Sequence, residues 1–362
     1  MKKRVLLVDD AAVIRSALSL AIAQDQDLEI AGTAANGRVA VSIFPALKPD
    51  IVLLDFKMPE MDGFATVREI RERDSRIPII MFSNLTERGA AVTLEALSSG
   101  VTDYVTKPSD ADMMATVDAI SRELLPKIRA LCHLPEVSNR LAPAAQPKMQ
   151  APPAPVPHPP RLPSPVQIVA IGVSTGGPDA LARVLPSLPA NFPVPVVVAQ
   201  HIPPIFASLL ASRLSAKSIL PVRVCVSGEP LRSGRVIIAP GDFHMVLSQD
   251  DGRLRLQTNQ APKENFCRPS VDVLFHSVAR VFGARALAVV LTGMGQDGLR
   301  GCETLRGLGA QIYVQDEASS VVWGMPGLVA RSGLAHKILP LDQIGAEIVR
   351  ATALKIAAHS QG

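Results

Sequence analysis

A single serine interrupts an apolar run near the middle of the chain and is followed by a glycine-rich turn. Ser174 comes directly after residues 168–173, and the sequence continues with Thr175, two glycines and Pro178. A serine on such a turn between a strand and a helix presents its hydroxyl at the edge of a sheet, near the positive end of the helix. The turn therefore favours a nucleophile, although the same pattern also occurs in turns that bind a phosphate or no ligand.

Two further side chains provide the groups that an activated serine needs. His201 follows the mostly apolar run 194–200, and Asp297 lies in the loop after the apolar run 286–291. A serine hydroxyl is a weak nucleophile at neutral pH, so an imidazole must take its proton and a carboxylate must hold the imidazole in one tautomer. If the three runs are neighbouring parallel strands, the three side chains meet at one edge of the sheet. An oxyanion formed by attack would need backbone donors, and the candidates are the glycine-rich loops around Gly293 and Gly295 and the amide of Met294.

Seven histidines compete for the role of the base. His244 lies beside Asp242 in a predicted turn, and His276 lies within a helical pattern beside a packing face, so a structural role is favoured for both. The other four fall in the linker or near the end of the chain: His133, His158, His336 and His359. The order Ser, His, Asp differs from the order Ser, Asp, His of α/β-hydrolases, so the serine turn does not imply that fold.

A second group of polar side chains lies in the first third of the chain, each after a short apolar run. Asp9 and Asp10 follow the first run, Asp55 the third, Ser83 the fourth and Lys107 the fifth. Three carboxylates in one place repel one another unless a cation joins them, so the group predicts a hard divalent ion such as Mg²⁺. A phosphoryl group on one carboxylate would gain a hydrogen bond from the serine and a charge partner in the lysine. Taken singly, each of these residues is equally compatible with a solvated strand end.

Strand and helix patterns alternate five times before residue 130. The predicted strands are residues 4–8, 28–32, 51–54, 79–82 and 103–106, each followed by a helical pattern. Such alternation predicts an α/β fold with a parallel sheet and helices on both faces, and function gathers at the carboxyl ends of its strands.

A second α/β domain is predicted from residue 166 onward, doubly wound and mainly parallel with a few antiparallel strands. Helices are expected at residues 271–282, 299–308 and 341–358. Short, more alternating segments are predicted to be extra strands, partly antiparallel and attached to the main sheet: residues 222–227, 235–239, 245–248 and 254–258.

The length of 362 residues suits two cores, which we expect in domains 1–130 and 166–362. Residues 131–165 between them are rich in proline and have no hydrophobic period, which predicts an extended tether. A spacer is favoured over a polyproline ligand for a partner.

Composition excludes several classes of protein. The net charge is +4, but no Lys/Arg block is interleaved with aromatics, so a nucleic-acid partner is not expected. No apolar run is long enough to span a membrane, and the basic start leads into a short strand rather than a signal peptide. The four cysteines are scattered without a CxxC pair, so neither a zinc site nor a disulfide framework is expected: Cys132, Cys225, Cys267 and Cys302. They suggest reduced thiols in the cytoplasm.

The motifs LLVDD, LLDFKMPEMDG, MFSNLT and DYVTKP, in this order and spacing, resemble the receiver domain of bacterial two-component response regulators. The resemblance implies a flavodoxin-like fold with five parallel strands. It also implies that Asp55 accepts a phosphoryl group from a chemotaxis histidine kinase, with Mg²⁺ held by Asp9, Asp10 and Asp55. Ser83 and Lys107 would support the phosphoryl group.

Two details of this resemblance stay open. Tyr104 falls where receivers often have a switching aromatic, and a packing role is equally compatible with its position. Phe56 and Lys57 follow Asp55 in place of the hydrophobic or acidic residues expected there, and a lysine near the metal is expected to shift Mg²⁺ affinity.

Six motifs of the second domain resemble the catalytic domain of chemotaxis protein-glutamate methylesterases, a family that joins a receiver to this domain through a linker. They are IGVSTGGP, QHIPP, IAPGDFHM, RPSVDVLFHSVA, LTGMGQDG and QDEASSVVWGMP. The resemblance implies that Ser174 is the nucleophile, His201 the base and Asp297 the orienting acid. It places Thr175 and the Met294 amide near the oxyanion. Two acidic residues of the last motif are assigned to packing at the rim of the site: Asp316 and Glu317.

The resemblance implies a cytoplasmic serine hydrolase that is activated by phosphorylation. Its substrates would be glutamate γ-methyl esters and selected glutamines on methyl-accepting chemotaxis receptors, and Mg²⁺ would serve phosphorylation alone, since hydrolysis needs no cofactor. No membrane insertion is expected, and the unphosphorylated receiver is expected to cover the rim that holds Ser174. Two alternatives stay open: an esterase acting on another methylated protein, and a phosphorylation-dependent binding module in which the serine serves only the turn.

Overall fold

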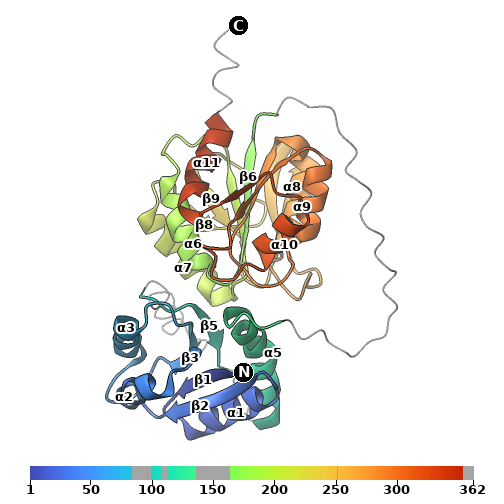
Figure 1. Cartoon of the computed structure of the whole chain (residues 1–362). Helices are drawn as coiled ribbons and strands as arrows, with labels where there is room; N and C mark the ends of the chain where they lie inside the picture. Colours follow the sequence, from blue (N-terminus) through green and yellow to red (C-terminus); the bar gives the residue numbers. More distant parts are fainter. Residues whose placement is uncertain (84–95, 97–98, 108–112, 136–163, 251, 354–362) are drawn as a thin grey trace.

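The computed structural model describes residues 1–83, 96, 99–107, 113–135, 164–250 and 252–353 (Figure 1). The chain forms two α/β units, each built on its own parallel sheet. We call them the N-terminal unit and the C-terminal unit. The proline-rich segment predicted as a linker falls mostly outside the described residues.

The N-terminal sheet contains the five predicted strands, all parallel, in the order β2-β1-β3-β4-β5. The strands are β1 (Lys3–Val8), β2 (Leu28–Ala34), β3 (Ile51–Asp55), β4 (Ile79–Ser83) and β5 (Asp103–Thr106). The helices are α1 (Ala12–Ala23), α2 (Gly37–Leu47), α3 (Gly63–Arg73) and α5 (Met113–Leu131). The helix expected after β4 falls mostly outside the described residues. This strand order is the flavodoxin-like one, as predicted.

Helices cover both faces of this sheet because its central strands are apolar on both sides. Along β1, Val5 and Leu7 join the hydrophobic cluster that contains α1 and α5 residues, while Leu6 and Val8 join the cluster that contains α2 and α3 residues. All four side chains are buried. The alternation of side chains along a strand therefore divides the core into two layers.

The C-terminal sheet has seven strands in the order β14-β13-β12-β6-β7-β9-β8, and every pairing in it is parallel. The strands are β6 (Ile168–Val173), β7 (Val196–Gln200), β8 (Val222–Val224), β9 (Val236–Ile238), β12 (Ala286–Val290), β13 (Gln311–Gln315) and β14 (Lys337–Leu339). The first strand, β6, is followed by β7 on one side, and the chain returns as β12 on the other. The order reverses between β6 and β12, and such switch points are where doubly wound sheets bind ligands.

Six α-helices accompany the described part of this sheet: α6 (Gly177–Val184), α7 (Pro204–Lys217), α8 (Val271–Phe282), α9 (Leu299–Gly307), α10 (Met325–Arg331) and α11 (Leu341–Ala353). Two short 3₁₀ segments follow α6 and α8, at Leu185–Ser187 and Gly283–Arg285. The contacts of α6 with α7 and α11, and of α8 with α9, place the two groups on opposite faces. The predicted closing helix begins at Leu341 as expected, and residues after 353 lie outside the described part.

One prediction about the extra strands was wrong. β8 and β9 extend the main sheet, but β10 (His244–Asp250) and β11 (Arg253–Asn259) form a separate antiparallel two-stranded sheet, and β11 also exchanges backbone hydrogen bonds with residues 228–231. One face of this hairpin packs in the hydrophobic cluster that also contains α8 residues, through the buried side chains of Met245, Leu247 and Leu256. Burial against a helix and hydrogen bonds to residues 228–231, rather than pairing with a strand of the main sheet, hold the hairpin in place. Within the described residues, no helix combines the length and the apolar character that crossing a bilayer requires.

Candidate active site and acidic cluster

Ser174 lies on the turn between β6 and α6, at the carboxyl edge of the C-terminal sheet. Its amide donates a hydrogen bond to the Thr292 carbonyl at 3.0 Å, and its carbonyl accepts one from the Gly177 amide at 2.8 Å. Gly176 has a φ of 77°, in the left-handed region that favours glycine. The turn thus holds Ser174 from both sides and leaves the residue partly exposed.

The loop after β12 passes so close to Ser174 that only glycine fits. A Cβ added to Gly293 would lie 2.4 Å from Met325 Sδ and 2.8 Å from Ser174 Cβ. The Gly293 amide donates to the Val322 carbonyl at 3.0 Å, and the Val322 amide donates to Thr292 Oγ1 at 3.0 Å. The last of the six motifs therefore holds this loop against the serine turn.

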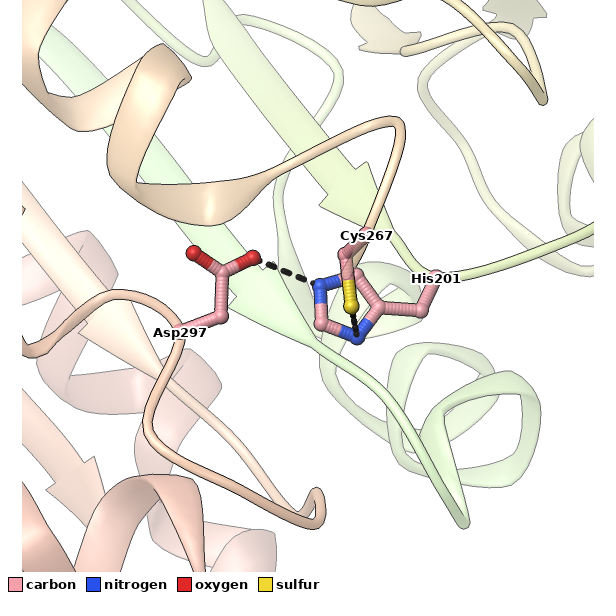
Figure 2. A group of neighbouring side chains, drawn as sticks. All are labelled: His201, Cys267 and Asp297. Atoms are coloured by element: carbon pink, nitrogen blue, oxygen red, sulfur yellow. Dashed lines mark hydrogen bonds and ion pairs between the residues drawn. The ribbon is translucent and has the colours of Figure 1, made fainter. Parts of the chain in front are cut away.

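His201 lies directly after β7, and its ring bridges the serine and an acid. Nδ1 lies 3.0 Å from Ser174 Oγ, and Nε2 lies 2.7 Å from Asp297 Oδ2. Figure 2 shows Asp297 at one ring nitrogen and Cys267 at the other. Because a carboxylate only accepts, Nε2 carries a proton, and in the neutral imidazole Nδ1 then accepts from the serine hydroxyl. The strands β12, β6 and β7 are neighbours, so the three side chains meet at one edge of the sheet.

Asp297 is held in place by the start of α8. Its side chain is 2% exposed. Besides the imidazole, its oxygens accept hydrogen bonds from Ser270 Oγ, Asn265 Nδ2 and the amides of Val271 and Asp272, at 2.7–3.0 Å. Donors at a helix N-terminus stabilise a negative charge, so the site keeps a buried carboxylate ionised and fixed in direction.

The hydrogen bonds shift the titration of both members of the pair. Burial disfavours the imidazolium of His201, but the hydrogen bonds with Asp297 and Cys267 outweigh burial and raise the pKa of His201 to about 10. Burial also opposes the Asp297 carboxylate, while the hydrogen bond with His201 and the α8 amides hold the pKa of Asp297 below its ordinary value. The carboxylate is therefore ionised at neutral pH, and the imidazole becomes an unprotonated base as the pH rises.

The residues predicted near an oxyanion have different surroundings. Thr175 is buried, and its carbonyl accepts from Thr292 Oγ1 at 3.0 Å. Met294 is partly exposed and packs against the hydrophobic cluster of the N-terminal unit. The Gly293 amide already donates to the Val322 carbonyl and is therefore not a free donor for an oxyanion.

The acidic residues of the N-terminal unit gather at the carboxyl edge of its sheet. Asp9, Asp10 and Asp55 each place a carboxylate oxygen within 4.8 Å of the others. Lys107 Nζ lies 2.7 Å from Asp9 Oδ2 and 2.9 Å from Asp55 Oδ2. Burial raises the pKa of Asp55 above its ordinary value, although Lys107 opposes this. Ser83 ends β4 next to this edge, and its side chain is outside the described part of the structure.

The two units touch beside the serine turn. Thr175 Oγ1 donates to Asp103 Oδ2 of β5 at 3.0 Å, and Lys127 Nζ of α5 lies 3.0 Å from the same oxygen. Tyr104 stacks on Phe206 of α7, with ring centroids 4.6 Å apart and planes 16° apart. Val322 joins the hydrophobic cluster of α1 and α5. Tyr104, for which a switching role and a packing role were both left open, therefore lies in the contact between the units.

Sequence reasoning missed several residues that shape this site. Gln200 donates to the carbonyls of Ser174 and His201, both at 3.0 Å. Asn265 bridges Asp297 and Asp272, at 3.0 and 2.9 Å. A polar residue at the end of an apolar strand was a usable signal for Gln200, whereas nothing in the spacing pointed to Asn265.

Of the two rival histidines weighed against His201, His244 has a structural role. His244 is fully buried, accepts from the Ser270 amide at 3.2 Å and lies 3.1 Å from the Pro262 carbonyl. His276 lies within α8 and is partly exposed. Asp316 caps its own turn, because its Oδ1 accepts from the Ser319 amide at 3.0 Å.

Fold and site together define a class of protein: a serine hydrolase on a doubly wound sheet, joined to a receiver domain of the response-regulator type. Residues 169–348 match the family model of the CheB methylesterase, and residues 5–118 match that of the response regulator receiver domain.

Relatives extend over nearly the whole chain. The protein-glutamate methylesterase/protein-glutamine glutaminase of Trichodesmium erythraeum is 44% identical over 352 residues, covering 96% of this chain and 99% of the relative. The protein of the same name from a Nocardioides species is 45% identical over 353 residues, covering 96% and 94%. The crystal structure of the Thermotoga maritima CheB methylesterase catalytic domain is 40% identical, with a TM-score of 0.50, and covers 52% of this chain and 99% of that one.

The chain belongs to the family of protein-glutamate methylesterases/protein-glutamine glutaminases. It is a hydrolase with a response-regulator receiver domain, and the family, fold and enzyme class predicted from the motifs are confirmed. We refer to the N-terminal unit as the receiver and to the C-terminal unit as the catalytic unit.

Proposed function

We propose that Ser174, His201 and Asp297 hydrolyse glutamate γ-methyl esters on methyl-accepting chemotaxis receptors. The single observation that carries this proposal is the unbroken hydrogen-bonded chain from Ser174 Oγ through the imidazole to Asp297 Oδ2, at 3.0 and 2.7 Å. The matching family model and the names of the relatives support the ester and the glutamine side chain as substrates.

The proposed reaction is acyl transfer in two halves. Ser174 Oγ attacks the ester carbonyl carbon while His201 Nδ1 takes the hydroxyl proton. The tetrahedral intermediate collapses when His201 returns that proton to the departing methoxide, which releases methanol and leaves an acyl-serine. Water then attacks the acyl group with the same base, and the free glutamate and the serine hydroxyl are restored. A glutamine substrate follows the same steps and releases ammonia.

Asp297 acts by orientation and charge. Asp297 Oδ2 accepts a hydrogen bond from the Nε2–H of His201, so the lone pair on Nδ1 faces Ser174. Its lowered pKa keeps it ionised, which stabilises the imidazolium formed during attack. We assign stabilisation of the developing oxyanion to the Met294 amide and to Thr175. Their positions beside Ser174, on the loop of Gly293 and on the serine turn, support this assignment.

The receiver is the proposed switch. Asp55 would accept a phosphoryl group from a chemotaxis histidine kinase, with Ser83 and Lys107 supporting it. A cluster of three carboxylates suits Mg²⁺, because this ion takes oxygen ligands, and Asp9, Asp10 and Asp55 would hold it. When bound, the ion neutralises charge on the transferring phosphoryl group. Lys107 already lies between Asp9 and Asp55 and would pair with the added negative charge.

We propose that the unphosphorylated receiver restrains the catalytic unit through the contacts around Thr175. The hydrogen bond from Thr175 to Asp103 and the stacking of Tyr104 on Phe206 support this proposal, because both lie beside the serine turn. A hundredfold restraint corresponds to about 2.7 kcal/mol, which is within reach of one charge-assisted hydrogen bond and one aromatic pair.

The proposed organisation keeps the predicted boundaries: receiver 1–130, linker 131–165 and catalytic unit 166–362. The unpaired state of all four cysteines supports a reducing compartment, and we propose the cytoplasm as the place of action. Receptors and a histidine kinase are the proposed partners.

A methanol-release assay tests the proposed function. The full chain is mixed with the methylated cytoplasmic fragment of a chemotaxis receptor, with and without a small phosphodonor and Mg²⁺. We expect the methylated fragment to release methanol with or without the phosphodonor and the ion, and to release it much faster when both are present. The unmethylated fragment is the control and should yield none. A chain that captures the fragment after phosphorylation but releases no methanol would instead be a binding module.

A further inference from the structure

Cys267 places a thiol beside the imidazole, where the proposed hydrolysis has no use for it. Its Sγ lies 3.5 Å from His201 Nδ1, the same nitrogen that faces Ser174 Oγ at 3.0 Å (Figure 2). We propose that His201 Nδ1 and Cys267 Sγ, with Ser174 Oγ as a third donor, form an inhibitory site for Zn²⁺. This inference rests on the proposed function, since it assigns a regulator to the same serine and imidazole.

The separation of the two ligand atoms fits a shared zinc ion. Bonds of about 2.3 Å to sulfur and about 2.0 Å to nitrogen at a tetrahedral angle place the two atoms roughly 3.5 Å apart. Sγ and Nδ1 are 3.5 Å apart. The ion would bind the sulfur as a thiolate and Nδ1 through its lone pair, so the thiol proton and any proton on Nδ1 would be released to solvent. Neither side chain needs a large movement to take up this geometry.

Asp297 also lies within 4.8 Å of these side chains, but it would act on the ion only through the imidazole. It lies at Nε2, across the ring from the thiol, and its two oxygens already accept five hydrogen bonds. A carboxylate that holds the far nitrogen of a histidine fixes the ring and makes the near nitrogen a stronger ligand. The acid that orients the base for hydrolysis thus also orients it for a metal.

The loop between β11 and α8 holds the thiol in position. The backbones of Glu264 and Cys267 exchange two hydrogen bonds, at 3.2 and 2.8 Å. The Arg268 guanidinium donates twice to Asp242 Oδ1, at 3.0 and 2.7 Å, and once each to the carbonyls of Gln260 and Ala261. A ligand fixed in this way loses little freedom when it binds an ion.

The site is open to the solvent. Cys267, His201 and Ser174 are all partly exposed, whereas the other three cysteines are buried. Two or three protein ligands leave positions for water, so the ion would exchange rather than stay as a structural centre. Mg²⁺ prefers oxygen ligands and would not compete for a thiolate and an imidazole, so zinc can be tested while the receiver is phosphorylated.

A bound ion would stop hydrolysis in a defined way. It occupies the Nδ1 lone pair, which is the base of the proposed reaction, and it lies where the ester carbonyl must approach Ser174. The two events exclude each other, so inhibition should be competitive with the methylated receptor and reversed by a chelator.

The test is a zinc titration of the full chain during methanol release, with zinc set by a chelator buffer and with phosphodonor and Mg²⁺ present. Each variant is normalised to its own zinc-free rate. We expect zinc to inhibit the parent chain and the Cys225→Ser control alike. Cys267→Ser should need at least about tenfold more zinc for the same inhibition. Even the loss of a residue that only orients a metal ligand lowers metal affinity by that factor, and Cys267 is a proposed ligand. Equal inhibition of the parent chain and Cys267→Ser would overturn the proposal, as would no inhibition of the parent chain.

A binding readout separates this proposal from the proposed function. Cobalt(II) replaces zinc in such sites, and a cobalt–thiolate bond gives a charge-transfer absorption band. We expect the band in the parent chain and in Ser174→Ala, and none in Cys267→Ser. A parent chain that shows the band but releases no methanol would refute the esterase and keep the metal site. A parent chain that releases methanol but shows no band would refute the metal site alone.

Discussion

The Thr175 hydroxyl donates a hydrogen bond to Asp103 Oδ2 at 3.0 Å, so a receiver carboxylate binds the residue that follows Ser174. Asp103 is 5% exposed, and its same oxygen lies 3.0 Å from Lys127 Nζ. A buried carboxylate with a cation and a hydroxyl as partners is costly to disturb. This contact joins the receiver directly to the serine turn.

Replacing this carboxylate should release the restraint. In the unphosphorylated chain, Asp103→Ala should raise methanol release by about tenfold, because the receiver loses one charge-assisted hydrogen bond to the catalytic unit. Asp118→Ala, an exposed position on α5, is the matched control and should leave the rate unchanged. A basal rate in Asp103→Ala no higher than that of the control would contradict the proposed restraint.

The acidic cluster predicts a separate dependence on metal and phosphodonor. Asp55→Asn should keep the basal rate and lose stimulation by the phosphodonor, because an amide does not accept the phosphoryl group. Chelation of Mg²⁺ should do the same to the parent chain, since the single charge of Lys107 does not balance three carboxylates within 4.8 Å when a phosphate approaches. Stimulation that survives both treatments would place the phosphorylation site elsewhere.

The His201–Asp297 hydrogen bond predicts the pH profile. The base must be unprotonated, and the pKa of His201 is raised to about 10, so the rate at saturating substrate should climb from neutral into alkaline pH. In Asp297→Asn the largest raising cause is lost while burial and the contact with Cys267 remain, so the acidic limb should move to lower pH. The maximal rate should nevertheless fall by about 10⁴, because the ring loses its tautomer. These profiles are measured by methanol release in chelator-treated buffer. An acidic limb at the same pH in both chains would contradict this account.

Because Gly293 lies so close to Ser174, one methyl group added at position 293 should lower the activity. In Gly293→Ala the new Cβ would lie 2.8 Å from Ser174 Cβ and 2.4 Å from Met325 Sδ, so the serine turn must shift. A shift of about 1 Å at the nucleophile costs roughly a hundredfold in rate. Gly307→Ala is the control, because a Cβ there meets nothing within 4 Å. Circular dichroism should show both variants folded, and equal rates would refute the proposed position of the nucleophile.

Much of this architecture follows from the sequence because the apolar runs are short and separated by polar ends. The five receiver strands appear at their predicted places, since the runs of the central strands are buried on both faces of a parallel sheet, and the edge strand β2, which is more exposed, still has a parallel neighbour in β1. The hairpin β10–β11 was assigned to the wrong sheet, because alternation predicts a strand with one buried face and not the partner that covers it. In this hairpin the partner is α8.

The serine, imidazole and acid were predictable for a further reason: each follows a strand, and neighbouring parallel strands end at one edge. The thiol of Cys267 was not. It contacts His201 across 66 positions of sequence from an irregular loop, and no periodic pattern predicts where such a loop points. The spacing of the four cysteines even argued against a metal site. Contacts between the two units, such as Asp103 with Thr175, were equally hidden, because they depend on how two finished surfaces meet.

The most direct test of the central claim is the rate of methanol release by Ser174→Ala on methylated receptor fragment. If the Ser174 hydroxyl is the nucleophile, this variant should be slower than the parent chain by roughly a thousandfold or more while its thermal unfolding is unchanged. Ser208→Ala, which removes an exposed serine of α7, should keep the full rate. A Ser174→Ala chain that releases methanol at a rate close to that of the parent would contradict the account.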